Sequence, residues 1–366
     1  MANLVLALNA GSSSVKCAVY ETADGAPVEI ARRAFEGASG AVIGLALDWA
    51  ESQRPDRRLI AAGHRVVHGG MRFTEPVRVT AQVLDALEAL TPLAPLHQPG
   101  SLAGLRRLAA LRPDLPQIAC FDTAFHRTQP ELATWLGLTR DLHDRGVRRY
   151  GFHGLNYEHV ADRLAQIDRR LARGRVIAAH LGAGASLCAL KAGASVDTTM
   201  GFSPLDGLMM ATRPGTLDPG AVLYLLQHEG LSPAEVEDLL YRRSGLFGVS
   251  GVSGDMRTLL ASDRAEAREA VALFVYRAAR EAAALIGVLE GVDGIVFTGG
   301  IGEHSPQVRA MIAARLAWTG LTLDPALNAR PGEGRISAQD SKVAAWAVPA
   351  DEERIIARHT LAALNR

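Results

Sequence analysis

The sequence predicts an α/β protein with a duplicated domain, and two observations lead to this prediction. Glycine-rich turns recur after short apolar runs, and amphipathic helices lie between them, as in α/β proteins. The stretches LALNAGSSSVKCAV (residues 6–19) and IAAHLGAGASLCAL (residues 177–190) both have the pattern of a strand, a small-residue turn with serine, and a second strand. Two copies of one hairpin indicate duplication, although Gly/Ala/Ser turns join strands in many folds.

The other elements follow from local signals in chain order. Thr80 can cap a helix whose apolar face includes Val83 and Leu87. Ser232, Pro233 and Glu235 have the order of a helix cap, a first-turn proline and a capping-box glutamate. Apolar runs predict strands at 4–8, 117–121, 176–179 and 294–297, an alanine-rich stretch predicts a helix over 262–289, and Ser305-Pro306 begins another helix.

Composition describes an ordinary globular protein. The chain has 366 residues, of which 48% are hydrophobic and 21% charged, and its 39 basic and 39 acidic residues cancel. Nothing in this balance favours nucleic acid or an anionic membrane, so any anion site is local. The N-terminus is not basic, and no apolar run approaches the roughly 20 residues that span a bilayer, so we expect a cytoplasmic protein. Its three cysteines form no CxxC pair and are expected to be buried free thiols.

The stretch NAGSSSVKCAVY (Asn9 to Tyr20) has the composition of a phosphate cradle. It lacks the Walker pattern and leads into an alternating strand instead of a helix, so a hairpin fits better. In such a turn, small residues let backbone N–H groups approach an anion. The serine hydroxyls add hydrogen-bond donors, and Lys16 adds a positive charge.

Further polar residues follow apolar strands, where α/β proteins place chemistry. They lie in GHRVVHGG (63–70), CFDTAFH (120–126), YGFHG (150–154), MMATRPGTLDPG (209–220), SGDMR (253–257), FTGGIGEHS (297–305) and VPADEER (348–354). Each alone also has a structural interpretation: packed histidines, a solvated arginine, a helix-capping aspartate, or first-turn glutamates favoured by the helix dipole.

Together these motifs resemble the acetate kinase family, from Leu4 to the end of the chain. The family consists of acyl-phosphate-forming kinases with the ribonuclease-H-like fold of actin, Hsp70 and sugar kinases. The resemblance implies two domains with a duplicated βββαβαβα core and a cleft between them. It places an N-terminal domain at residues 1–125 and a nucleotide-binding domain at 126–353, with a last helix, 354–366, folding back onto the first domain.

The resemblance implies reversible, direct in-line transfer of the ATP γ-phosphate to acetate, giving acetyl phosphate and ADP, with Mg²⁺ as the metal, Mn²⁺ as its alternative, and a homodimeric enzyme. Asp122, His153, Arg213 and Arg65 would be catalytic. We expect Asp122 to orient Arg65 or the Mg²⁺ shell, because acetate is already ionised at pH 7 and needs no base. By motif position, the resemblance also assigns the nucleotide and metal sites. The phosphates would contact His180, Leu181, Gly182, Ala183 and Gly184, the adenosine would contact Asp255, Met256 and Arg257, and a loop of Gly300, Ile301, Gly302, Glu303 and His304 would lie beneath the adenosine. Ser12, Ser14 and Lys16 would lie near the transferred phosphate, and Asn9 and Glu352 would lie at the metal.

The resemblance also implies a small substrate pocket. Arg65 would bind the carboxylate, and the remaining pocket residues would be Val67, Leu96, His97, Phe152 and Pro204. One methylene is worth only about 1–3 kcal/mol of discrimination, so propionate is expected as a slow substrate and a propionate kinase is an alternative. Ala183 departs from the family pattern, because asparagine is common there and supplies a side-chain donor.

Two other classes remain as alternatives. A nucleotide-gated protein of the actin or Hsp70 type would use the same nucleotide site without an acid substrate. ATP hydrolysis independent of acetate would support it. A sugar or hydroxyl kinase would use Asp122 as a general base and would act on polyols.

Overall fold

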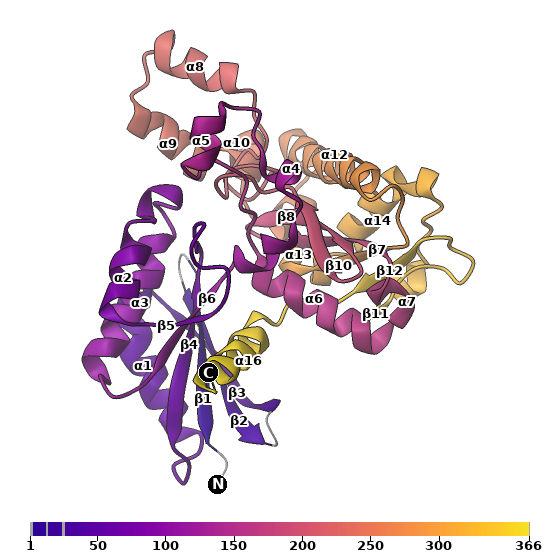
Figure 1. Cartoon of the computed structure of the whole chain (residues 1–366). Helices are drawn as coiled ribbons and strands as arrows, with labels where there is room; N and C mark the ends of the chain where they lie inside the picture. Colours follow the sequence, from indigo (N-terminus) through magenta and orange to yellow (C-terminus); the bar gives the residue numbers. More distant parts are fainter. Residues whose placement is uncertain (1–2, 12–13, 24–25, 366) are drawn as a thin grey trace. The chain divides into compact units, whose positions relative to one another are not determined.

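The computed structural model describes residues 3–11, 14–23 and 26–365, which form two compact units (Figure 1). Unit 1 comprises Met1–Arg127, Phe152–His159 and Asp351–Arg366, and unit 2 comprises Thr128–Gly151 and Val160–Ala350. The division into folding domains at residue 125, with a last helix from 354, stays a prediction. No helix in the described part of the chain is long and apolar enough to cross a membrane.

Unit 1 is built on a six-stranded sheet with the order β3-β2-β1-β4-β6-β5. Strands β1, β2 and β3 are antiparallel neighbours, whereas β4 is parallel to β1 and to β6. The strands are β1 (Leu4–Ala10), β2 (Ser14–Ala23), β3 (Ala26–Glu36), β4 (Leu59–Val66), β5 (Val77–Arg78) and β6 (Gln117–Phe121). The helices are α1 (Ser39–Ser52), α2 (Ala81–Glu88), α3 (Gln98–Leu111), α16 (Glu352–Leu364) and the short η1 (Thr91–Leu93) and η2 (Ala124–Thr128); α6 (Gly154–Ile167) runs from unit 1 into unit 2.

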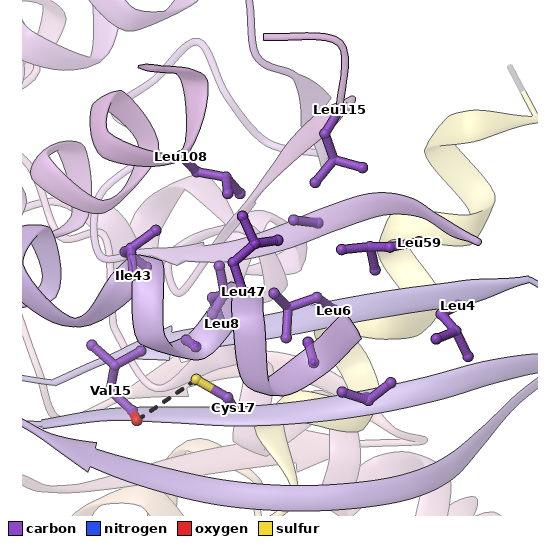
Figure 2. Close-up of a cluster of buried hydrophobic side chains, with 14 of the residues drawn as sticks. Leu4, Leu6, Leu8, Val15, Cys17, Ile43, Leu47, Leu59, Leu108 and Leu115 are labelled. Carbon is purple, nitrogen blue, oxygen red and sulfur yellow. Dashed lines mark hydrogen bonds between the residues drawn. The ribbon is translucent and has the colours of Figure 1, made fainter. Parts of the chain in front are cut away.

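The two faces of this sheet bury different sets of side chains, because side chains alternate along a strand. Leu4, Leu6 and Leu8 of β1 pack with Ile43 and Leu47 of α1 (Figure 2). The same cluster includes Leu59 of β4, Leu108 of α3 and Leu115. The alternate residues Val5 and Ala7 pack with Ile355 and Ile356 of α16, on the opposite face. We call this second side of the sheet the α16 face.

Helix α16 lies directly on β4, and Gly63 is the reason that it can. A Cβ atom at Gly63 would lie 2.1 Å from Thr360 Oγ1 and 2.6 Å from Ile356 Cγ2. Both distances are shorter than real Cβ contacts, so any larger residue would push the helix off the strand. This close approach holds the N-terminal turn of α16 near the carboxyl end of β4.

Unit 2 repeats the same topology. Its sheet has the order β11-β12-β10-β7-β8-β9, which corresponds strand for strand to β5-β6-β4-β1-β2-β3, so the predicted duplicated α/β fold is confirmed. The strands are β7 (Arg175–Leu181), β8 (Ala185–Lys191), β9 (Ala194–Thr198), β10 (Gly294–Thr298), β11 (Gly334–Arg335) and β12 (Ala344–Ala347). The helices are α4 (Glu131–Thr134), α5 (Arg140–Asp144), α7 (Arg169–Ala172), α8 (Pro219–Gln227), α9 (Pro233–Arg242), α10 (Gly245–Ser250), α11 (Met256–Leu260), α12 (Ala265–Val288), α13 (Gly299–His304), α14 (Pro306–Arg315), α15 (Pro325–Asn328) and the short η3 (Ala317–Thr319).

Most of the local predictions hold. Thr80 accepts a hydrogen bond from the backbone of Val83, Ser232 and Glu235 form a full capping box, and Ser305 caps α14. Both echoed stretches are antiparallel hairpins, and all three cysteines are buried and free. The expected loop at residues 300–304 is wrong, because these residues belong to the helix α13.

Candidate functional site

Four polar residues predicted from motifs lie at one end of the α16 face of unit 1. Asn9 continues the alternation of Val5 and Ala7, and Lys16 is its partner on β2. Arg65 follows Gly63 by two residues on β4, and Asp122 follows Cys120 by two residues just beyond β6. Because β1, β4 and β6 are parallel, their carboxyl ends meet at the same edge of the sheet. The N-terminal turn of α16 brings the carboxylates of Glu352 and Glu353 to Asn9 there.

Arg65 and Asp122 form a two-pronged ion pair. Arg65 Nε donates to both carboxylate oxygens of Asp122 at 3.0 and 3.1 Å, and Nη2 donates to Oδ2 at 2.5 Å. Nη1 donates to the carbonyl oxygen of Ala10 at 3.3 Å. The side chain of Asp122 is 1% exposed, whereas that of Arg65 is 15% exposed. Burial lowers the pKa of Arg65, but Asp122, Glu352 and Glu353 together raise it above its usual value, so the guanidinium stays charged.

Asn9 links the sheet to α16 through its amide nitrogen. Nδ2 donates to Glu352 Oε2 at 2.8 Å and to Glu353 Oε1 at 2.7 Å. The pKa of Glu352 is raised to about 7, mainly by burial. The negative charges of Asp122 and Glu353 also raise it, whereas the positive charge of Arg65 and the hydrogen bond from Asn9 lower it. The site therefore concentrates negative charge that a cation would offset.

These residues fit Mg²⁺, which proteins bind through one or two carboxylates together with substrate phosphates and waters. Glu352 supplies a carboxylate. With the amide nitrogen of Asn9 engaged by two carboxylates, its oxygen is the atom that can face a metal. Among the described residues, no group of three or more His, Cys, Asp and Glu side chains forms a complete protein cage for a metal.

The backbone at His153 adopts a left-handed conformation with φ of 58°, which is uncommon for any residue with a Cβ. Its neighbours hold it there. His126 Nε2 donates to the carbonyl oxygen of Phe152 at 2.9 Å, and Gly154 N donates to Asp122 O at 2.9 Å. A Cβ at Gly154 would lie 2.1 Å from that same carbonyl oxygen, so only glycine lets this segment reach the Arg65–Asp122 pair.

The predicted apolar wall is partly gathered in unit 1. Val67 and Phe152 are buried, and the Phe152 ring meets that of His68, next to Val67, edge to face at 5.5 Å. Leu96 is half exposed, and His97 lies at the N-cap of α3. The fifth residue, Pro204, belongs to unit 2.

In unit 2 the structure brings together the turn after β7 and the helix α13. A Cβ at Gly182 would lie 3.8 Å from Gly300 N, and one at Gly299 would lie 2.9 Å from Leu181 O. The carbonyl of Ala183 accepts a hydrogen bond from Ala211 N at 3.1 Å. The turn therefore carries its exposed backbone beside the N-terminus of α13, an arrangement suited to phosphate. His180 on β7 pairs with Thr298 on β10, just before α13.

The other predicted nucleotide residues adjoin this region. A Cβ at Gly254 would lie 3.0 Å from Ala211 O, which places Asp255 and the start of α11, with Met256, close to the turn. Arg257 lowers the pKa of Asp255 to about 2 through their ion pair, which is exposed. Glu303 accepts from Ala350 N at 2.8 Å, so α13 is tied to the segment just before α16. The same short helix carries the exposed His304 and the partly buried Ile301.

Arg213 lies two residues after Ala211, in the loop that contacts the turn at 182–184. Its Nη1 donates to Pro204 O at 2.7 Å. On the hairpin of unit 1, Ser14 and exposed Lys16 begin β2, and Gly11 N donates to Ser14 O at 2.8 Å across the turn. Ser12 lies outside the described residues.

Two arginines contact the predicted site residues but were missed by motif analysis. Arg32 of β3 donates to Glu353 Oε2 at 2.9 Å and to Asp351 Oδ1 at 2.5 Å. Arg309 of α14 is fully buried and donates to the carbonyl oxygens of Gly302 and Glu303 in α13. Neither arginine lies in a glycine-rich motif. The only sequence signal for them is that each is a charged residue inside a strand or helix.

Known proteins resemble this chain over its whole length. Residues 28–358 match the model of the acetokinase family. The acetate kinase of Rhodopseudomonas palustris is 52% identical, over 98% of both chains, and that of Methylocella silvestris is 45% identical, over 100% of this chain and 99% of the other. The crystal structure of Porphyromonas gingivalis acetate kinase is 34% identical, has a TM-score of 0.86 and matches 99% of this chain and 100% of the other. A propionate kinase from Francisella tularensis is also 34% identical, with a TM-score of 0.88 over 98% and 99% of the two chains. These matches show that the chain belongs to the acetokinase family.

Proposed function

We propose that this protein is an acetate kinase, which transfers the γ-phosphoryl group of ATP to acetate in a reversible, Mg²⁺-dependent reaction that gives acetyl phosphate and ADP. The observation that carries the proposal is the Arg65–Asp122 pair at the strand ends. A forked guanidinium held in place by a buried carboxylate is suited to a planar carboxylate or phosphate. Relatives at 52% and 45% identity carry the same name.

The geometry of Asp122 favours an acid substrate over an alcohol. Both of its carboxylate oxygens accept hydrogen bonds from Arg65, and its side chain is almost fully buried. A general base needs an oxygen within reach of the substrate proton. Acetate carries no such proton at pH 7, so Asp122 acts as a positioning residue that aims Arg65.

Transfer requires positive charge around the migrating phosphoryl group, whose charge spreads over three equatorial oxygens. Arg65 binds the acetate carboxylate, Arg213 binds acetate or phosphoryl oxygens, and His153 donates to the equatorial oxygens. Bound Mg²⁺, held by Asn9 and Glu352, would offset the charge of the nucleotide phosphates. Most of the catalysis is then positioning and electrostatic stabilisation.

Unit 2 is proposed to bind the nucleotide. The backbone of the turn at 182–184 and the N-terminus of α13 take the phosphates, which compensates for the side-chain amide that Ala183 lacks. Asp255, Met256 and Arg257 flank the adenosine. Lys16 and Ser14 of unit 1 act on the transferred phosphate.

The test traps the acyl phosphate with hydroxylamine while formate, acetate, propionate and butyrate are supplied in parallel with ATP and Mg²⁺. We expect acetate to give the highest kcat/KM, with ADP formed in equal amount to hydroxamate. ATP hydrolysis without an acid substrate would support the actin or Hsp70 type instead, and transfer to polyols would support a sugar kinase. Preference for propionate would make the protein a propionate kinase, as the Francisella structure allows.

Val67→Ala is expected to raise the propionate-to-acetate ratio of kcat/KM. The change removes two carbons from the proposed pocket wall, and one substrate methylene is worth about 1–3 kcal/mol, or roughly 10–200-fold. We expect a shift of about 10-fold, because the other proposed pocket residues, such as Leu96 and Phe152, are unchanged. Val66→Ala makes the same chemical change at a buried neighbour that packs on Phe73 and Phe121, and should leave the ratio unchanged. Equal ratios in wild type and Val67→Ala would move the pocket elsewhere.

We also propose a homodimer formed through α8. This helix has an apolar sequence, PGAVLYLLQ, yet none of its residues is buried, and Leu223 and Tyr224 are 52% and 53% exposed. An apolar face of this kind is typical of a subunit interface.

Leu223→Glu is therefore expected to halve the mass measured by light scattering, because the interface would bury an unpaired charge. Gln227→Glu, on the same helix, adds the same charge at a polar position and should leave the mass unchanged. A Leu223→Glu protein that kept the wild-type mass would exclude this face as the interface.

A further inference from the structure

The strand β3 contains an irregularity that redirects Arg32. Ala18 of β2 is paired with Arg32, and Tyr20 is paired with Glu29, so two residue steps along β2 are matched by three along β3. The register shifts between Val19 and Tyr20, which is the mark of a β-bulge. In a regular strand, residues three apart point to opposite faces. The bulge therefore lets Glu29 and Arg32 point to the same face.

That face is the α16 face, because Ala18 and Tyr20 pack there against Ile355 and Ile356. Glu29 fixes the arginine from its own strand, since Arg32 Nη2 lies 2.7 Å from Glu29 Oε2. Tyr20 Oη donates to the same glutamate oxygen at 3.3 Å. Arg32 is thus aimed along the sheet toward the N-terminal turn of α16.

At this turn Arg32 forms ion pairs with two carboxylates, one that caps the helix and one that binds Asn9. Nη2 lies 2.5 Å from Asp351 Oδ1, and Asp351 caps α16 by accepting from Arg354 N. Nη1 donates to Glu353 Oε2 at 2.9 Å. The other oxygen of Glu353 accepts from Asn9 Nδ2 at 2.7 Å, and the Glu353 side chain is only 3% exposed. One guanidinium therefore holds both the cap of the helix and the carboxylate that grips Asn9.

We infer that Arg32 is a positioning residue for the metal site: through Glu353 it holds the amide of Asn9 with its nitrogen toward α16 and its oxygen free to bind the metal or a metal-bound water. This inference rests on the proposed function, in which Asn9 and Glu352 hold Mg²⁺. Glu353 is then a link between Arg32 and Asn9, because each of its two oxygens accepts a hydrogen bond from one of them. Mutation of residues that orient metal ligands in this way typically costs about 10–100-fold in metal affinity.

A merely structural role for Arg32 predicts lower thermal stability with unchanged Mn²⁺ affinity. The side chain of Arg32 is 37% exposed, but that of Glu353 is only 3% exposed, so loss of Arg32 should itself lower the unfolding temperature. Thermal unfolding therefore does not separate the two roles, whereas metal affinity does. The effect should appear in metal affinity, because the buried Glu353 would lose one of its two partners and Asn9 could turn.

The experiment measures Mn²⁺ binding directly, by electron paramagnetic resonance of the full-length protein with ADP present, in wild type, Arg32→Gln, Arg32→Lys and Arg33→Gln. Arg33 is the matched control, because it is the adjacent arginine of the same strand and lies over the ring of Phe35 at 4.9 Å. We expect Arg32→Gln to weaken Mn²⁺ binding roughly 10–100-fold. Arg33→Gln should bind as wild type does. Arg32→Lys should lie between the two, since a lysine keeps the charge but not the fork.

Two further measurements test whether Arg32 acts on the metal site through Glu353. Glu353→Gln should weaken Mn²⁺ binding in the same way, and the double variant Arg32→Gln/Glu353→Gln should lose little more than either single change, because the two residues act as one unit. Equal Mn²⁺ affinity in Arg32→Gln and Arg33→Gln would overturn the inference while leaving the proposed function in place. Absence of Mn²⁺ binding and of acyl phosphate formation in the wild type would overturn both.

Discussion

Arg65→Ala is expected to lower kcat by about 10²–10³-fold, the usual cost of removing a preorganised donor from a developing negative charge. It should also raise the KM for acetate, because Arg65 is proposed to bind the carboxylate before and during transfer. Arg65→Lys should recover little activity, since an ammonium group cannot keep two prongs on Asp122 and still reach the substrate. Steady-state kinetics with acetate as the varied substrate measures both effects.

Measurements of thermal stability show whether Arg65→Ala loses activity because a catalytic group is missing or because the fold is weakened. Asp122 is 1% exposed, and breaking a buried ion pair from one side typically costs about 3–5 kcal/mol because a lone charge stays buried. The double variant Arg65→Ala/Asp122→Asn removes both charges and should recover much of the thermal stability without recovering activity. Arg58→Ala, at the exposed residue just before the same strand, is the control and should change neither the activity nor the thermal stability. Recovery of activity together with stability would show that Arg65 serves only the fold.

The sequence signals that place polar residues at the strand ends are local, so they can be read without the structure. Arg65 and Asp122 each follow an apolar strand in a motif, and the duplicated hairpins carry their own glycine and serine signals. The contact between the two side chains is not local, since 57 residues separate them. It depends on the pairing of Arg65 with Cys120 between β4 and β6, which the strand pattern alone does not specify.

Arg32 shows what a motif analysis cannot detect. Its direction toward α16 depends on a bulge in β3, and residues 28–36 of this strand contain no glycine or proline that would indicate one. With regular alternation, Arg32 and Glu29 would lie on opposite faces. The one available signal is the placement of two opposite charges three residues apart inside an otherwise alternating strand.

The helix α13 shows how a glycine-rich stretch can mislead. Its three glycines favour a loop by intrinsic propensity. In the structure, Gly299 has φ of 76°, and a Cβ there would lie 2.9 Å from Leu181 O, whereas a Cβ at Gly302 would make only ordinary contacts and one at Gly300 would meet nothing within 4 Å. Gly299 is therefore needed for the close approach of this short helix to β7, and the helix forms in spite of the low helix propensity of the other two glycines.

Glu352→Gln is the second change with a large expected effect, and it should move activity and stability in opposite directions. Glutamine keeps the volume of the side chain and an oxygen that can accept from Asn9 Nδ2, but it removes the negative charge that Mg²⁺ requires. We expect the Mg²⁺ concentration for half-maximal rate to rise at least 10-fold, in the range seen when groups around a metal are altered. Mg²⁺ titrations of the acyl phosphate assay measure this shift.

In the metal-free protein the same change should be stabilising at alkaline pH. Burial raises the pKa of Glu352 from 4.5 to about 7, so between these values the folded chain keeps a proton that the unfolded chain has released. Stability of the wild type therefore falls as the pH rises through this window, and Glu352→Gln lacks that loss. With EDTA present, the variant should unfold at a higher temperature than wild type at pH 8, and the difference should shrink toward pH 4.5. A variant less stable than wild type at pH 8 would mean that the Glu352 carboxylate is already neutralised by Arg65 and Asn9, and that a cation is not needed to offset its charge.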